Sequence, residues 1–358
     1  MKTNLIFTAL LSGASVIAAG CAGIGPPSIA RDRFDYVASI SDSWKRQMLQ
    51  NLLKVRYTDA PVFLDVTSVI SGYSITSGLN VGGQYTPVGR SGDTFGSFGG
   101  SVGYADHPTI TYAPLSGDKF ARGFLAPLSV SAVLYLLQSG YPADVVLRIC
   151  ANEINGLDNA YGGPGNPRAG DPRFAELLAA MREAQGAGIL GMRIKSVKDQ
   201  QELALYFRAS GAATTAPMRK IQELLGLNPQ AREYNVVYGS FPANDTEIAI
   251  LSRSALQVLT DFASYIDVPA SEVAEGRVYA PPRSAEQERM FPRLVHIHSG
   301  DAAPANAHVS VRYRDQWFWI DDRDVQSKAL FSFLMLLFSL TETGTPQAGA
   351  PVVTVPAR

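Results

Sequence analysis

The most regular hydrophobic pattern in the chain lies between residues 69 and 112. From residue 69 to residue 85 most odd positions are apolar or aromatic, whereas the even positions from 72 onward are glycine or polar. This alternation is the period of a β-strand with one apolar face and one polar face. A turn-rich stretch at 86–93 separates it from a second alternating run. We therefore predict a long, Gly-rich amphipathic β-hairpin with an apolar side made of Tyr73, Ile75, Leu79, Val81, Tyr85, Phe98, Val102 and Tyr104.

Helical periodicity covers much of the remaining chain. Ser41 or Ser43 is placed to cap a first helix that ends near residues 58–61. After the hairpin, the spacing of apolar residues and the positions of Pro, Gly and Ser at their ends predict several more helices. These span residues 119–125, 129–138, 142–155, 171–184, 216–225, 254–266 and 324–341.

Short β-branched or aromatic runs predict strands between these helices. They lie at residues 61–69, 192–197, 234–238, 247–252, 294–298, 308–313 and 316–320. Strands 234–238 and 247–252 are expected to pair antiparallel, and a turn at Arg314–Asp315 is expected to join the strands at 308–313 and 316–320. The strand at 316–320 is apolar on both faces, which indicates a central position in a sheet or a place at an interface. Because strands neighbour one another in sequence, we expect an α+β fold with an antiparallel sheet and packed helices.

The first residues have the organisation of a signal peptide. Lys2 precedes an apolar run at 5–17, and Ala18-Ala19-Gly20 leads into Cys21. The run of about 13 residues is short for a transmembrane helix, which needs about 20. The small residues before Cys21 resemble the lipobox of bacterial lipoproteins, which implies cleavage before Cys21 and lipid on its thiol; an ordinary secretory signal is the alternative.

This organisation divides the chain into six expected segments. They are a signal peptide at 1–20, a lipidated tether at 21–30, a part with helix, hairpin and helical pair at 31–158, a Gly/Pro-rich loop at 159–170, an α+β domain at 171–343 and an extended tail at 344–358. Since the residue after Cys21 is Ala22 rather than aspartate, the lipoprotein resemblance implies the outer membrane, facing the periplasm. The inner membrane and the cell surface are the less favoured locations.

Composition narrows the partners of the domain. The chain has 31 Lys and Arg against 32 Asp and Glu, and this near neutrality argues against a nucleic-acid partner, which would need a basic face. Cys150 is the only cysteine besides Cys21, so no disulfide is expected within the domain. It lies on an apolar helix and is interpreted as a small buried hydrophobic residue rather than a nucleophile.

Three stretches resemble an uncharacterised family of proteobacterial envelope lipoproteins. The most distinctive is the C-terminal stretch at residues 311–328, which contains the motif Trp-Phe-Trp-Ile-Asp-Asp-Arg-Asp at 317–324, and the others lie at 44–65 and 107–121. The resemblance extends over most of the chain after the signal peptide. It implies an envelope location and transfers no catalytic or ligand-binding residue, because that family has no established activity.

Two groups of residues are candidates for metal binding. Asp321, Asp322 and Asp324 lie at a strand-to-helix junction. Carboxylates there can bind a divalent ion or act as acid and base. The alternative is a structural role, in which they cap the helix. The structural interpretation is favoured. His296 and His298 alternate on a predicted strand and share a face, with His308 nearby in sequence. Without a Cys or an acidic residue at ligand spacing, surface or interface histidines are favoured over a metal pair.

A serine hydrolase is the other chemical alternative. Ser116 and Lys119 match the Ser-x-x-Lys pattern of penicillin-binding enzymes, and residues 298–300 loosely resemble their third motif. Gly123 and Pro127 shorten the helix that this mechanism needs, and no Gly-x-Ser-x-Gly elbow supports a Ser-His-Asp triad. The pattern is therefore not favoured.

Together these features predict a non-enzymatic, membrane-anchored lipoprotein of the bacterial envelope that assembles with itself or with other envelope proteins. The hairpin is the expected element of assembly or membrane contact, and its strands exceed the 9 to 11 residues that cross a bilayer in a β-barrel. No cofactor is expected. The alternatives are a periplasmic hydrolase, using Ser116 and Lys119 or Asp321 and Asp324, and a monomeric ligand-binding module.

Overall fold

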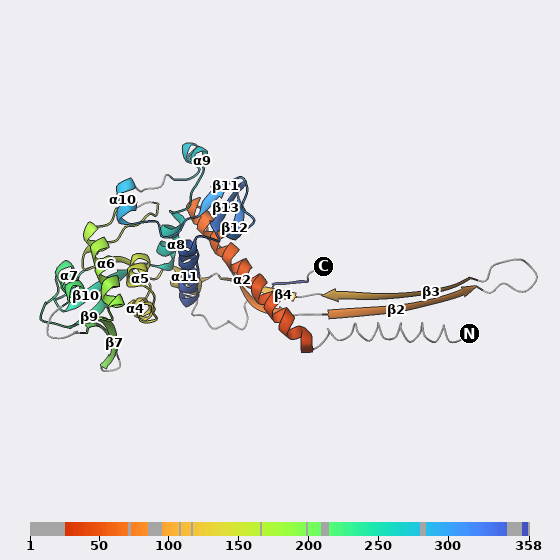
Figure 1. The fold of residues 1–358 in the computed structure, drawn as a ribbon, viewed down its shortest axis with the longest axis horizontal. Coiled ribbons are helices and arrows are strands. Elements are labelled where there is room, and N and C mark those ends of the chain that lie inside the picture. Colours follow the sequence, from red (N-terminus) through yellow and green to blue (C-terminus); the bar gives the residue numbers. More distant parts are fainter. Residues whose placement is uncertain are drawn as a thin grey trace, which may run out of the picture. The chain divides into compact units, whose positions relative to one another are not determined.

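Helices and largely antiparallel sheets form an α+β fold of two units (Figure 1). The first unit comprises residues 1–61 and 118–343, and the second comprises residues 62–117 and 344–358. The computed structural model describes residues 26–70, 73–84, 95–106, 109–115, 117–164, 167–197, 200–208, 215–279, 284–341 and 353–356. Within these residues no helix combines the length and the apolarity that a membrane crossing requires.

A six-stranded sheet lies at one side of the first unit, in the order β6-β5-β10-β9-β8-β7. Its strands are β5 (Ala151–Ile154), β6 (Leu157–Asp158), β7 (Leu190–Val197), β8 (Gln200–Phe207), β9 (Glu233–Tyr238) and β10 (Glu247–Ser252). The sequence had indicated β9, β10 and most of β7, but not β5, β6 or β8.

A layer of four helices packs with this sheet (Figure 1). They are α4 (Val130–Gln138), α5 (Ala143–Cys150), α6 (Pro172–Gly186) and α7 (Ala216–Leu225). Local signals explain their ends: the Asp171 side chain accepts a hydrogen bond from the Arg173 amide at the start of α6, and Gly226 ends α7 with φ +64°. Buried side chains between helices and sheet include Leu134, Leu147, Leu177, Leu205, Ile248 and Ile250.

The rest of the first unit surrounds helix α8 (Ala255–Ala263), which has buried residues on all of its faces. Helices α2 (Pro26–Arg56), α3 (Asp118–Leu125) and α11 (Val325–Thr341) each contact α8. A three-stranded sheet, β11-β13-β12, packs against α2 through β12. Its strands are β11 (His298–Gly300), β12 (Ala307–Tyr313) and β13 (Gln316–Asp321), and two short helices, α9 (Ala270–Ala274) and α10 (Ala285–Met290), precede it.

Strand β13 occupies the central position that its pattern predicts. Phe318 and Ile320 are fully buried on one face, while Trp317 and Trp319 are partly buried on the other. The turn into β13 is the expected one, because Arg314 and Asp315 have φ of +46° and +69° and Tyr313 pairs with Gln316. Two consecutive left-handed residues are the geometry of a two-residue hairpin turn.

The end of α2 meets this turn in an aromatic cluster. The rings of Tyr57 and Tyr313 lie 5.4 Å apart, and the Arg314 guanidinium lies 4.9 Å from the Tyr57 ring centre. The Tyr313 hydroxyl donates to Asp59, whose carboxylate also pairs with Arg314. Burial, together with the Asp59 hydrogen bond and charge, raises the pKa of Tyr313 to about 12. Residues 57–59 and 313–314, far apart in the sequence, therefore pack on each other.

The pairing of β9 with β10 is parallel, so the antiparallel pairing expected for these strands is wrong. Glu247 pairs with Asn235 and Ile250 with Tyr238, both strands running in one direction. Parallel strands usually need a crossover of a dozen or more residues. Here residues 239–246 suffice, because an extended chain of that length spans about 26 Å, more than the roughly 20 Å of a six-residue strand.

Two predicted helices have different bounds. The helix expected at 142–155 ends at Cys150, where the chain continues as β5 and pairs with β10, so that sheet pairing outweighs helical periodicity. The first helix begins at Pro26 rather than at Ser41 or Ser43. Residues 26–30, expected as tether, therefore belong to a helix.

The Gly/Pro-rich loop at 159–170 is not a boundary between domains. Strands β5 and β6 precede the loop, yet they belong to the same sheet as β7–β10, which follow it. Its backbone is also anchored: the Arg253 guanidinium donates to the Ala160 carbonyl at 2.6 Å, and the Gly162 amide donates to buried Asp261 at 2.7 Å. These hydrogen bonds hold the start of the loop against buried side chains.

The second unit consists of strands alone among its described residues. They are β1 (Phe63–Ile70), β2 (Tyr73–Gln84), β3 (Phe95–Asp106), β4 (Thr109–Leu115) and β14 (Val353–Pro356). Strand β4 pairs with β1 and with β14, so part of the expected extended tail is a third strand of that sheet. Strands β2 and β3 form a long two-stranded ribbon (Figure 1).

Candidate functional site

The ribbon β2–β3 has the amphipathic register that the sequence predicts. Ile75 pairs with Tyr104 and Val81 with Phe98, whereas Thr76 pairs with Gly103 and Asn80 with Gly99. Directly paired residues share a face of an antiparallel ribbon. The register therefore places positions Tyr73, Ile75, Leu79, Val81, Phe98, Val102 and Tyr104 on one face, which also carries Ser77, Gly83, Gly96, Gly100 and Asp106. The other face carries glycine and small polar positions, with Phe95 at its end.

The described side of this ribbon is the polar one. Thr76, Gly78, Asn80, Ser101 and Gly103 are all exposed, and the Thr76 hydroxyl donates to the Gly103 carbonyl. The side chains at the apolar positions and the whole of Tyr85 lie outside the described residues. The structure contributes the register of the ribbon. This register puts the seven described positions of the predicted apolar set on a single face.

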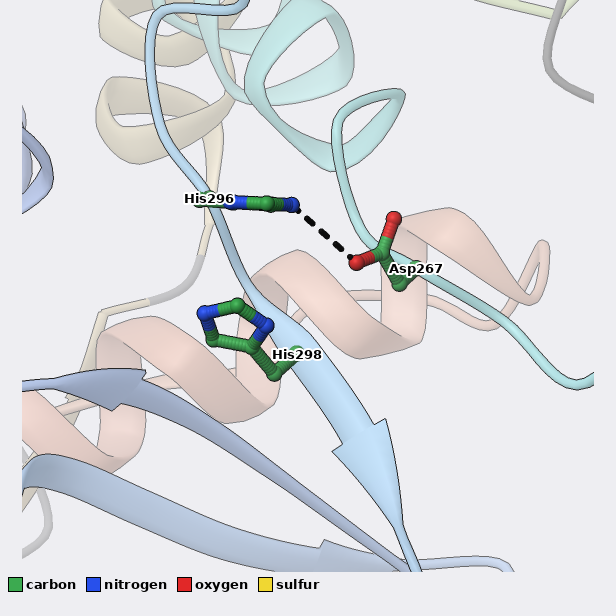
Figure 2. A group of neighbouring side chains, drawn as sticks. All are labelled: Asp267, His296 and His298. Carbon is green, nitrogen blue, oxygen red and sulfur yellow. Dashed lines mark ion pairs between the residues drawn. The ribbon is translucent and has the colours of Figure 1, made fainter.

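A cluster of possible metal ligands lies in the first unit, where Asp267, His296 and His298 bring their ligand atoms within 4.8 Å of one another. His296 Nε2 lies 3.3 Å from Asp267 Oδ2, and the two imidazole centres are 4.4 Å apart. Figure 2 shows the His296 imidazole directed toward the Asp267 carboxylate, with the His298 ring beside it. Among the described residues, this is the one group in which three or more His, Cys, Asp or Glu side chains lie close enough together to bind a metal ion.

Backbone pairing holds the three residues of the cluster together. Asp267 follows α8, and its amide donates to the Ile297 carbonyl at 2.9 Å, beside a parallel bridge between Ile266 and Ile297. His296 is fixed from the other side, because its amide donates to the Ser327 hydroxyl at 2.8 Å. The His298 ring stacks on Trp319 at 5.6 Å, which restricts the imidazole to one side of the strand.

The surroundings of the cluster contain more charge. Asp267 Oδ1 accepts a hydrogen bond from Arg293 at 2.7 Å, and Arg293 also pairs with Glu288. Burial opposes ionisation of Asp324, but hydrogen bonds from Ser327 and the charges of His296 and His298 hold the pKa of that carboxyl below its usual value. A cavity of about 430 Å³ has Asp267, Glu288 and Arg293 on its wall.

Sequence reasoning found the two histidines and missed their carboxylate. The alternation of His296 and His298 correctly indicated one face, but Asp267 comes from a loop far earlier in the chain. No local spacing marks it, since the contact depends on pairing of residues 266–267 with residue 297. His308 lies outside the cluster, with Nδ1 3.8 Å from Asp322.

The acidic residues at the start of α11 have structural partners. Asp324 accepts from the Ser327 amide at 2.9 Å and from its hydroxyl at 2.6 Å, which caps the helix. Asp322 pairs with Lys328 at 2.7 Å, and Asp321 accepts from the Arg323 amide at 2.8 Å. The carboxylates of Asp321 and Asp324 therefore each accept hydrogen bonds near the start of α11, and neither belongs to the described cluster with ligand spacing.

The other candidate residues are placed as follows. Cys21 and Ser116 lie outside the described residues, as does the side chain of Lys119, which is the second residue of α3. Cys150 is fully buried, and burial raises the pKa of its thiol to about 12, as expected for a packed rather than a reactive cysteine.

Comparison with known proteins adds no relative. No protein-family model, curated protein or solved structure matches the chain.

Proposed function

We propose that this protein is a lipoprotein of the bacterial envelope, anchored by lipid on Cys21, that assembles with further copies of itself through the β2–β3 ribbon. The observation that carries the proposal is the ribbon's register. It gathers seven apolar positions of two 12-residue strands on one face, while Phe95 and Ala105 lie on the other. The chain acts in this proposal as a structural component rather than as an enzyme.

The physical support is that such a ribbon is poorly suited to stand alone. A two-stranded hairpin is marginally stable in water, and its outer edges carry main-chain groups that can pair with another strand. At about 3.4 Å per residue, each strand is about 40 Å long, so its apolar face is large. Further copies of the ribbon would pair those edges and cover that face.

The anchor and the ribbon act together in this proposal. Two or three acyl chains on Cys21 would hold each copy at one membrane surface, because multiple chains attach far more firmly than one. Because anchoring confines the copies to one membrane surface, it raises their local concentration and favours their association. The outer membrane, facing the periplasm, is the location consistent with Ala22 after the lipidated cysteine. Strands longer than the 9 to 11 residues of a bilayer crossing also allow assembled ribbons to enter the membrane.

The test uses neighbouring residues on opposite faces. The mass of the full chain, extracted from membranes in mild detergent, is measured by light scattering and native mass spectrometry. We expect a discrete oligomer for the wild type, dissociation for Leu79→Asp, and an unchanged oligomer for Asn80→Asp, because a charge is excluded from an apolar contact but tolerated on an exposed polar face.

Two further variants define the limits of the test. Deletion of residues 76–101 should give a monomer with the wild-type circular dichroism in the helical region, and Cys21→Ser should release the protein from the membrane fraction. A monomeric wild type, or dissociation caused equally by Leu79→Asp and Asn80→Asp, would contradict assembly through this face. Retention of Cys21→Ser on membranes would contradict the anchor.

A further inference from the structure

We propose that Asp267, His296 and His298 form a binding site for a divalent transition-metal ion of the Zn²⁺ class. The site lies wholly in the first unit and is independent of the ribbon and of the lipid anchor. Two imidazole nitrogens and one carboxylate oxygen are a ligand set that borderline metal ions prefer, whereas Ca²⁺ and Mg²⁺ prefer oxygen ligands alone.

The distances fit coordination after small side-chain movements. Zn–N and Zn–O bonds of about 2.0 to 2.2 Å place neighbouring ligands of a tetrahedral ion about 3.3 Å apart. His296 Nε2 and Asp267 Oδ2 already have that separation, 3.3 Å. The remaining ligand atoms lie within 4.8 Å, so the His298 ring has to approach by at most about 1.5 Å, a shift that rotation of its side chain supplies.

The site is built by contacts that precede any ion. Pairing of Asp267 with Ile297 fixes the carboxylate beside the histidine segment, and Ser327 fixes the His296 backbone. Arg293 binds Oδ1 of Asp267 and leaves Oδ2 for the ion, which is the outer hydrogen bond that ligating carboxylates usually have. Preorganised ligands lose less entropy on binding.

Charge and access also favour a cation. Two carboxylates besides that of Asp267 contribute negative charge: Glu288 shares Arg293 with Asp267, and Asp324 interacts with the charges of His296 and His298. The side chains of His296 and Asp267 are 47% and 39% exposed, so an ion reaches them from solvent. Three protein ligands leave a further coordination position for water or for a ligand in the adjacent cavity, as in zinc sites with an open position.

The experiment measures Zn²⁺ binding directly. The full chain, made without a polyhistidine tag and stripped with a chelator, is titrated with Zn²⁺ in competition with a chromophoric chelator, and Co²⁺ is used for visible absorption. We expect one Zn²⁺ per chain, d–d bands of low-symmetry Co²⁺, and a rise in melting temperature with Zn²⁺. Asp267→Asn and His298→Gln should each weaken binding more than about 100-fold, since even outer-shell changes cost 10- to 100-fold.

Matched controls separate coordination from general effects. Asp322→Asn and His308→Gln alter a carboxylate and a histidine outside the cluster and should keep wild-type affinity. Melting in chelator shows whether each variant is folded, and Arg293→Gln, which leaves all three ligands in place, should still bind one ion. The proposal is overturned if wild-type protein binds no stoichiometric Zn²⁺, or if folded Asp267→Asn binds as tightly as the wild type.

Discussion

Buried arginines in the first unit differ in what faces their guanidinium. Arg148 and Arg253 converge on Asp261, at 3.8 and 3.1 Å, and all three side chains are almost fully buried. Arg56 is equally buried, yet among the described residues no carboxylate pairs with its guanidinium, whose polar neighbour is Tyr279. It stacks 4.1 Å from the Tyr279 ring centre, and burial lowers its pKa.

These environments predict responses of different size to the same substitution. Arg253→Met should lower the free energy of unfolding by about 3 to 5 kcal/mol, because it removes a partner of buried Asp261 and of the Ala160 carbonyl. Arg56→Met should change it by no more than about 1 kcal/mol, since loss of a cation–π contact is offset by removal of an unpaired buried charge. Urea unfolding followed by circular dichroism measures both variants. Equal destabilisation would show that Arg56 has a partner of comparable strength.

At the scale of elements, the chain uses the same capping motif in two settings. Ser254 and Gln257 exchange hydrogen bonds at the start of α8, and Ser284 and Gln287 do so at the start of α10. Helix α8 is buried among α2, α3 and α11, whereas α10 has no buried residue. The motif is readable in sequence, but its energetic weight depends on the packing around it.

Ser254→Ala should therefore destabilise the protein more than Ser284→Ala. We expect a loss of about 1 to 2 kcal/mol for Ser254→Ala, the usual range for a lost cap, because α8 cannot fray without exposing apolar surface. Ser284→Ala should cost less than about 0.5 kcal/mol, since a short exposed helix can unwind locally. Urea midpoints of the two variants test this order. An equal or reversed order would mean that the buried contacts of α8 do not depend on its cap.

At the scale of the whole molecule, the two units differ in how their strands are covered. In the first unit Ile248, Ala249 and Ile250 of β10 are buried in the centre of a six-stranded sheet. In the second unit β2 and β3 pair with each other alone among the described strands. Stability should therefore be unevenly distributed along the chain.

Amide hydrogen exchange should report this difference. In Leu79→Asp, which we expect to be monomeric, amides of β2 and β3 should exchange at least about 100-fold faster than those of β9 and β10, because a lone ribbon opens easily. Mass spectrometry of peptides after timed exchange gives both rates. Protection of the ribbon should rise in the wild-type oligomer, and strong protection already in the monomer would show that other parts of the same chain cover the ribbon.

The sequence by itself determined the features that depend on near neighbours. Alternation with a period of two specified the amphipathic ribbon, and Asp171, Ser254 and the Arg314–Asp315 turn marked the ends of elements where the structure has them. The two-faced apolar pattern at 316–320 likewise predicted a central strand. These signals are local because backbone geometry within one element depends on adjacent residues.

Only the tertiary structure decided what depends on distant segments. The parallel pairing of β9 with β10 and the change from helix to strand at Cys150 follow from the sheet that assembles around them. The candidate metal site is a mixed case, since the spacing of His296 and His298 is local but Asp267 joins them through pairing with Ile297. Contacts between remote residues arise from collapse and packing, which no short pattern in the chain encodes.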